Sequence, residues 1–277
     1  TVHGTGQVRG GEVSLDASSS SQLVSGLLLA GARFARGVLL RHTGSRIPSQ
    51  PHLRMTVQML RSAGAAVDDG TADVWLVEPG RLSGREWEVE PDLPGAAPFL
   101  AAALVTGGEV TIPDWPASTV QPVDSLRILL EQLGASCSLT LNGLTVRGGA
   151  TIHGIDADLS DVSELTPVVA ALCVLADRPS RLSGVAHIRG HEADRLTALA
   201  RELSGLGAGV TETADGLAIA PAPLRGGRFE TYDDHRLAHA AAVIGLAVPE
   251  VRLTDVACTA KTMPEFPALW SSMVNGQ

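Results

Sequence analysis

The stretch LTALARELSGLGAGV, residues 196–210, has the pattern of an amphipathic helix that stops at Gly207 and continues as a strand. A glycine at that point supplies the left-handed conformation that commonly ends a helix. The same plan recurs in LRMTVQMLRSAGAAV (53–67), which stops at Gly64, and in LRILLEQLGASCSL (126–139), which stops at Gly134. Recurrence at about 70 residues predicts one supersecondary unit repeated along the chain.

A second kind of helix precedes each copy and is apolar on nearly every side. These segments are QLVSGLLLAGA (22–32), AAPFLAAALVTGG (96–108) and LTPVVAALCVLA (165–176), with a fourth, RLAHAAAVIGLAV, at 236–248. Helices without a polar face are typical of protein interiors. A short strand and an acidic or hydroxyl cluster are expected before each one. The unit is therefore predicted to run strand, buried helix, strand, amphipathic helix, hairpin, and the last copy lacks its hairpin.

This repeat predicts an α/β protein of quasi-symmetric βαβαββ units. We expect a first domain over residues 1–88, a second over 89–277, and a link near SGREWEVE (83–90). A single doubly wound sheet is the alternative, but it would not explain a hairpin after every amphipathic helix.

Composition excludes several classes of function. The 277 residues are 44% hydrophobic and 18% charged with a net charge of -9, which indicates a globular protein and argues against a general nucleic-acid binder. Three cysteines without a CxxC pair disfavour a disulfide framework or zinc site and favour a reducing compartment, so we expect a cytoplasmic protein. The apolar runs are too short to cross a membrane, and no signal peptide is visible.

Polar side chains gather where the chain enters its helices. Ser20, Ser21 and Gln22 fall in LDASSSSQLVSG (15–26), and Ser49 falls in SRIPSQPH (45–52). Helix N–H groups and hydroxyls bind anionic oxygens, although a serine-rich cap and a proline-set loop explain these stretches as simply.

Four later junctions carry charge. They are DVSELTP (161–167), HIRGHEADR (187–195), TYDDHR (231–236) and ACTAKTMPEF (257–266). A helix beginning near Glu192 would put His191 and Arg195 on one face, Glu164 would open a buried helix, and Lys261 would precede a helix marked by Pro264. Exposed ion pairs, caps and a solvated lysine explain each junction taken singly. Because all four fall at the same point of successive repeats, we expect them at one end of the architecture.

With SSSSQ, HEADR, TYDDHR and CTAKT in this order, the chain resembles the EPSP synthase (5-enolpyruvylshikimate-3-phosphate synthase) family over its whole length, in the form typical of high-GC actinobacteria. The resemblance implies two inverse α/β-barrel-like domains of three βαβαββ units each, the first incomplete here, with substrates between them. It implies transfer of the enolpyruvyl group of phosphoenolpyruvate to the 5-hydroxyl of shikimate 3-phosphate in aromatic amino acid biosynthesis. It further implies no metal or organic cofactor, and a monomer at full length.

The resemblance also implies residue roles. Ligands of shikimate 3-phosphate are expected at Ser20, Ser21, Gln22, Ser49, Glu164 and His191, and ligands of phosphoenolpyruvate at Gln22, Arg195, Arg236 and Lys261. Glu164, Glu192 and Lys261 are the expected catalytic residues. His52 replaces a frequent Tyr, and His187 and His191 replace Asn and Lys. Asp233, Asp234 and His235 are expected to orient Arg236 and cap its helix.

Several points stay open at this stage. Which of Glu164 and Glu192 acts as acid and which as base is undecided. The chain begins at Thr1 and lacks the family's N-terminal Lys-Ser motif, its glycine loop and a further Arg, so we expect a fragment with little activity alone. The alternatives are a truncated, non-catalytic protein that binds shikimate 3-phosphate, and a UDP-N-acetylglucosamine enolpyruvyl transferase.

Overall fold

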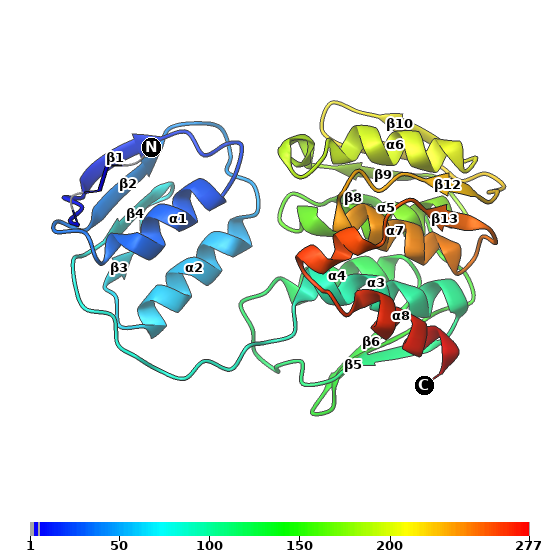
Figure 1. The fold of residues 1–277 in the computed structure, drawn as a ribbon, viewed down its shortest axis with the longest axis horizontal. Coiled ribbons are helices and arrows are strands. Elements are labelled where there is room, and N and C mark those ends of the chain that lie inside the picture. The colour runs from blue at the N-terminus through cyan, green and yellow to red at the C-terminus, as the bar shows by residue number, and fades with distance from the viewer. Residues whose placement is uncertain (1–2, 5, 277) are drawn as a thin grey trace. The chain divides into compact units, whose positions relative to one another are not determined.

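The computed structural model describes residues 3, 4 and 6–276, and contacts divide the chain into two compact units, Thr1–Val89 and Glu90–Gln277. The first unit follows the predicted plan. Its elements are β1 (Gly11–Leu15), α1 (Gln22–Gly31), β2 (Val38–His42), α2 (Gln50–Ser62), β3 (Val67–Asp68) and β4 (Val74–Val77). They form one sheet in the order β1-β2-β4-β3, on which both helices pack (Figure 1).

Helix α1 is less buried than its apolar sequence predicts. Val24, Leu28 and Gly31 are buried, but Leu23 and Leu29 are 48% and 51% exposed. The expectation of a helix buried on every side is wrong here. The reason is that α1 packs on one sheet and one neighbouring helix, α2, which together cover a single face.

The second unit contains the remaining copies. The second copy consists of α3 (Leu93–Thr106), β5 (Glu109–Ile112), α4 (Val123–Gln132), β6 (Ser136–Thr140) and β7 (Gly143–Arg147). The third copy consists of β8 (Asp156–Asp158), η1 (Ser163–Leu165), α5 (Thr166–Val174), β9 (Ser180–Ser183), η2 (Ala186–Gly190), α6 (Arg195–Gly205), β10 (Gly209–Glu212) and β11 (Leu217–Ala220). The fourth copy consists of β12 (Gly227–Phe229), α7 (His235–Gly245), β13 (Val251–Leu253), η3 (Ala257–Lys261) and α8 (Phe266–Asn275). The last copy has no hairpin within the described residues, as predicted.

The repeat prediction is confirmed in its main features. The three amphipathic helices are each followed by a glycine of positive φ, namely Gly64, Gly134 and Gly207, and then by an antiparallel strand pair. The strands form four separate sheets within the described part of the chain, so the alternative of one doubly wound sheet is wrong.

One expected strand is missing before α3. Residues 81–92 form no strand, and Trp87 and Val89 in this stretch are 47% and 89% exposed. A strand is stable only beside a hydrogen-bonded neighbour, and no described strand pairs with this stretch. The second copy therefore runs αβαββ rather than βαβαββ.

Three apolar helices form the interior of the second unit. Helices α3, α5 and α7 contact one another, and each also contacts strands of its own repeat (Figure 1). All nine residues of α5 are buried. The prediction of buried helices is correct for these three because sheet and helix neighbours together surround them.

Strand direction decides where the polar junctions lie. Strands β1 and β2, β8 and β9, and β12 and β13 pair in parallel. The carboxyl ends of parallel strands meet at one edge of a sheet, so the loops that leave paired strands start side by side. Among the described residues, no helix combines the length and apolar character needed to cross a membrane.

Candidate active site

Four loops of the second unit bring together the charged residues predicted from the sequence. Glu164 follows β8, Arg195 follows β9, Arg236 follows β12 and Lys261 follows β13. Contacts link all four loops: Arg195 and Arg236 both contact Glu164, while Arg195 and Lys261 both contact Glu192. The charges thus form one continuous network.

Arg195 lies at the centre of this network and is only 1% exposed. Its Nε donates to Asp234 Oδ2 at 2.7 Å, and its Nη2 donates to Glu192 Oε2 at 2.7 Å and to Asp234 Oδ1 at 3.3 Å. Its Nη1 donates to Glu164 Oε2 at 3.0 Å and to His191 Nδ1 at 2.9 Å. A guanidinium has five N–H groups, so every donor of Arg195 already has a partner.

The contact with Arg195 fixes the protonation state of His191. Because an arginine can only donate, the His191 Nδ1 that faces it must accept, and the ring is therefore neutral. Burial lowers the pKa of His191, and the Arg195 charge adds to this effect against the opposing influence of Glu164 and Glu192. His191 thus supplies no permanent positive charge to this site.

Glu164 sits in the turn η1 before α5 and holds the two arginines together. Its Oε2 lies 3.0 Å from Arg195 Nη1 and 2.6 Å from Arg236 Nε, the latter an ion pair without hydrogen-bond alignment. Burial alone would raise the pKa of Glu164, but the charges of Arg236 and Arg195 outweigh burial and lower it. Glu164 is therefore ionised in this state.

Glu192 bridges two cations. Its Oε1 pairs with Lys261 Nζ and its Oε2 with Arg195 Nη2. Burial would raise its pKa, yet the hydrogen bond from Lys261, its own backbone N–H and the two positive charges lower it to about 2. An anion in the position of the Glu192 carboxylate would thus contact both Arg195 and Lys261.

Two helix starts differ from the sequence prediction. Helix α6 begins at Arg195 rather than near Glu192, because the Asp194 side chain caps it by accepting from the Thr197 N–H at 3.1 Å. His191 reaches Arg195 from the preceding loop instead of from the same helical face. Helix α8 begins at Phe266, beyond Pro264, and Lys261 is the last residue of η3.

The role expected for the TYDDHR acidic residues also needs correction. Asp234 caps α7 by accepting from the Arg236 N–H at 2.9 Å, as expected, but its carboxylate orients Arg195 rather than the Arg236 side chain. Asp233 is exposed, and His235 is buried with its Nδ1 4.0 Å from Asp234 Oδ1, beyond hydrogen-bonding distance. The Asp234–Arg195 pair has no signature in the sequence because 39 residues separate the two positions, and the cap before α7 is the local role that a motif can indicate.

Four of the six shikimate-side candidates, Ser20, Ser21, Gln22 and Ser49, lie in the first unit, at the carboxyl edge of β1 and β2. Ser20 Oγ accepts from the Gln22 N–H at 3.2 Å, Ser21 is buried, and Gln22 is exposed at the start of α1. Ser49 is buried just before α2 with φ at 54°. These side chains therefore sit at two adjacent helix starts.

One histidine joins the two loops of that edge. His42 Nδ1 accepts from the Ala17 N–H at 3.1 Å, so its Nε2 carries the proton donated to the Ser45 carbonyl at 2.5 Å. His52 lies half-buried in the first turn of α2. In the second unit, His187 Nε2 lies 2.9 Å from Ser163 Oγ, and burial together with the His191 ring lowers the pKa of His187 to about 4.

A second polar feature lies inside α7. His239 is 1% exposed, its ring centroid is 4.4 Å from that of Phe266, and neither ring nitrogen has a hydrogen-bond partner among the described residues. Burial lowers the pKa of His239 to about 3, helped by the charges of Arg236 and His235.

His239 should therefore make the second unit sensitive to acid. In the unfolded chain the pKa of His239 is near 6.5, so between pH 6.5 and 3 the unfolded state binds a proton that the folded state does not. The free energy of unfolding is therefore unaffected by His239 above pH 6.5 and decreases as the pH falls from 6.5 towards 3. The loss approaches about 1.4 kcal/mol per pH unit. Urea unfolding between pH 7.5 and 4 should show a slope that includes this contribution, and His239→Phe should make it shallower, while His187 and His191, whose pKa values are also lowered, keep part of it. An equal pH dependence in both proteins would contradict the expectation.

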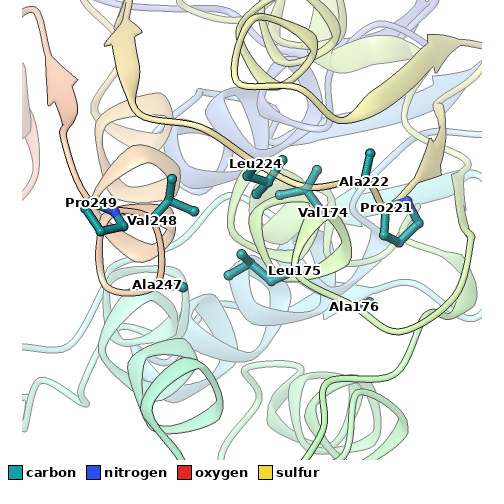
Figure 2. A pocket seen from close by; sticks show the side chains of 9 residues that line it. All are labelled: Val174, Leu175, Ala176, Pro221, Ala222, Leu224, Ala247, Val248 and Pro249. Carbon is teal, nitrogen blue, oxygen red and sulfur yellow. The ribbon is translucent and has the colours of Figure 1, made fainter.

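One pocket lies at the opposite ends of α5 and α7 from the charged network. Figure 2 shows that Val174, Leu175, Leu224 and Val248 are among the residues that line it, and its volume is about 430 Å³. No lining side chain is titratable, so the pocket offers no acid, base or anion ligand. No group of three His, Cys, Asp or Glu side chains within residues 3, 4 and 6–276 could hold a metal ion.

Comparison with known proteins agrees with this fold and charge pattern. The family described as EPSP synthase (3-phosphoshikimate 1-carboxyvinyltransferase) matches residues 1–270. Two curated relatives, the 3-phosphoshikimate 1-carboxyvinyltransferases of Mycobacterium ulcerans (strain Agy99) and Kocuria rhizophila, are each 53% identical over 277 residues. The alignments cover 99% and 100% of this chain but 64% and 62% of the relatives, so the chain spans less than two thirds of their length.

Solved structures give the same result. EPSP synthase from Acinetobacter baumannii has a TM-score of 0.78 at 25% identity, covering 96% of this chain and 63% of that one. The enolpyruvyl transferase NikO from Streptomyces tendae shares the fold, with a TM-score of 0.69 at 18% identity and coverage of 96% and 64%. The class is thus defined: the chain has the α/β fold of the enolpyruvyl transferases. It belongs to the EPSP synthase family, which confirms the resemblance found in its sequence.

Proposed function

We propose that this protein transfers the enolpyruvyl group of phosphoenolpyruvate to the 5-hydroxyl of shikimate 3-phosphate and releases phosphate. The observation that carries the proposal is the convergence of Arg195, Arg236 and Lys261 on the two carboxylates of Glu164 and Glu192. Relatives with 53% identity carry the name of this activity, and no second function has a comparable observation in its favour.

Phosphoenolpyruvate brings a carboxylate and a phosphate, which suit two guanidinium forks and an ammonium. Arg236 and Lys261 each have one carboxylate partner within the network, and the Lys261 side chain is 52% exposed. Each N–H group of Arg195 already donates a hydrogen bond to a residue of the protein. Substrate binding at Arg195 therefore requires an internal partner to leave, and Glu192, the most exposed of its three carboxylate partners, is the one we propose.

The proposed reaction is an addition followed by an elimination. In the first step the 5-hydroxyl oxygen bonds to C2 of phosphoenolpyruvate, its proton passes to a base, and an acid delivers a proton to the C3 methylene. In the second step C3 loses a proton, the double bond forms again, and the C2–phosphate bond breaks. Glu164 and Glu192 supply the acid and the base, and Lys261 assists the departing phosphate.

The residues proposed for shikimate 3-phosphate occur at helix starts of the first unit and, separately, in the charged network of the second unit. Ser20, Ser21, Gln22 and Ser49 offer hydroxyl, amide and backbone donors at two helix starts. Glu164 and the neutral His191 are proposed to contact the sugar hydroxyls, and Gln22 to contact both substrates. The chemistry consists of proton transfers and C–O bond exchange, which this set of residues can perform without an organic cofactor.

A cytoplasmic location is part of the same proposal. Cys137, Cys173 and Cys258 are all free thiols, which agrees with a reducing compartment. Burial raises the pKa of Cys173 to about 11, so this thiol is protonated and unreactive near neutral pH.

Phosphate release tests the function. The complete gene product that carries these residues, given both substrates, should release phosphate, and omission of either substrate should stop it. Arg236→Ala should reduce kcat/KM for phosphoenolpyruvate by about 10²–10³-fold, as expected for a lost charged ligand of the reacting group. Arg225→Ala, which removes an exposed arginine outside the network, is the matched control and should have no effect.

Release without shikimate 3-phosphate, or equal activity of Arg236→Ala and Arg225→Ala, would sink the proposal. The 277-residue chain assayed alone tests the separate expectation that it has little activity by itself.

A further inference from the structure

Asp234 contacts both arginines of the proposed phosphoenolpyruvate site. Its side chain is wholly buried. Oδ2 accepts from Arg195 Nε at 2.7 Å, and Oδ1 accepts from Arg195 Nη2 at 3.3 Å, so both carboxylate oxygens hold one edge of the guanidinium. Oδ1 also accepts from the backbone N–H of Arg236 at 2.9 Å. One carboxylate therefore joins the side chain of Arg195 to the first turn of α7.

We propose that Asp234 is a positioning residue that sets the spacing of Arg195 and Arg236 for phosphoenolpyruvate. The inference rests on the function proposed above. Arg195 projects from the start of α6 and Arg236 from the start of α7. The two oxygens of Asp234 bond to the Arg195 side chain and to the Arg236 backbone N–H, so Asp234 fixes the Arg195 guanidinium relative to the helix start from which Arg236 projects.

The turn that carries Asp234 is itself held firmly. Tyr232 and Asp233 adopt positive φ values of 52° and 57°, an unfavourable conformation that persists only where surrounding contacts impose it. The Tyr232 hydroxyl donates to Glu202 Oε1 at 2.7 Å, and the Glu230 N–H donates to Glu202 Oε2 at 2.9 Å. Glu202 lies two turns after Arg195 on α6, so this helix holds the turn at two points.

Only a carboxylate fulfils both roles of Asp234. An asparagine could still cap α7, but its amide N–H groups would face the N–H groups of Arg195 and could not accept from them. A serine would also cap the helix, since it is among the preferred N-cap residues, but it would leave Arg195 without its bidentate carboxylate partner. Asp234→Ser therefore separates helix capping from the positioning of Arg195.

The experiment compares Asp234→Ser and Asp234→Asn with Asp233→Asn in the complete gene product. Asp233 is the adjacent exposed carboxylate and serves as the matched control. Both Asp234 variants should raise the KM for phosphoenolpyruvate at least tenfold while leaving the KM for shikimate 3-phosphate within about twofold of the unchanged protein. Asp233→Asn should match the unchanged protein in both constants. Calorimetric titration with phosphoenolpyruvate should show the same order of affinities.

A purely structural role would give different results. If Asp234 acted only as a helix cap, its substitution by Asn would lower the melting temperature and the active fraction without a selective change in either KM. Asp234→Ser, which keeps a cap, would then have the kinetics of the unchanged protein. Either result overturns the inference. Should the unchanged protein neither release phosphate nor bind phosphoenolpyruvate, the proposed function fails and this inference fails with it. If the unchanged protein is active and Asp234→Ser has the same two KM values, the role of Asp234 is refuted while the proposed function stands.

Discussion

Arg195→Ala is expected to lower the free energy of unfolding of the second unit by about 3–5 kcal/mol, the usual cost of removing one partner from a buried ion pair. Arg195 is 1% exposed and Asp234 is wholly buried. Without the guanidinium, the Asp234 carboxylate would keep only the backbone N–H of Arg236, and Glu164 and Glu192 would face each other with less positive charge between them. Urea unfolding at pH 7 measures the difference.

Arg189→Ala is the matched control for this loss of stability. Arg189 also pairs with two carboxylates, Asp194 at 3.3 Å and Glu212 at 2.7 Å, but its side chain is 31% exposed. Water can solvate its partners after substitution, so the expected cost is below about 1 kcal/mol. Equal costs at the two positions would show that burial of the Arg195 network contributes no stability.

Glu192→Gln is expected to have opposite effects on catalysis and on binding. Loss of a general acid or base typically reduces kcat by about 10²–10⁴-fold. Binding of phosphoenolpyruvate should nevertheless tighten, because the neutral amide no longer competes for Lys261 and Arg195. A competing ion pair of about 1 kcal/mol corresponds to a decrease in Kd of roughly fivefold. Stopped assays and calorimetry on the complete gene product measure the two effects separately.

Proton uptake tests the same exchange of anions directly. The pKa of Glu192 is about 2 while Lys261 and Arg195 surround it, and it should rise when substrate anions take these cations. Binding of phosphoenolpyruvate at pH 5 should then be accompanied by proton uptake, visible as a dependence of the calorimetric heat on the buffer. Glu192→Gln should abolish this uptake, and Glu212→Gln, which alters an ion-paired carboxylate outside the network, should preserve it. Tighter binding without any change in proton uptake would contradict the role given to Glu192.

Residue order alone was enough to predict the repeat. Gly64, Gly134 and Gly207 end equivalent helices because a glycine takes the left-handed conformation at little cost, which is a local property of the chain. The apolar character of α5 predicted burial on every side for the same kind of local reason. The motifs also led to the correct family, since four junction sequences in one order carry much information.

Tertiary structure decided what the same local rules left open. Helices α1 and α5 are similarly apolar, yet Leu23 and Leu29 of α1 are exposed, because burial depends on how many neighbours a helix has. Likewise, WEVE (87–90) has a strand-like sequence but no strand beside it in the described chain.

The site shows the same division. Sequence motifs named Arg195, Arg236, Lys261, Glu164 and Glu192, and their equivalent positions in successive repeats predicted that their loops would meet. Only the folded chain revealed that Asp234 faces Arg195, that Arg195 has no unused donor, and that His191 is neutral. Side-chain pairing across 39 residues of chain depends on how α6 and α7 pack together, and packing is a property of the whole unit rather than of either motif.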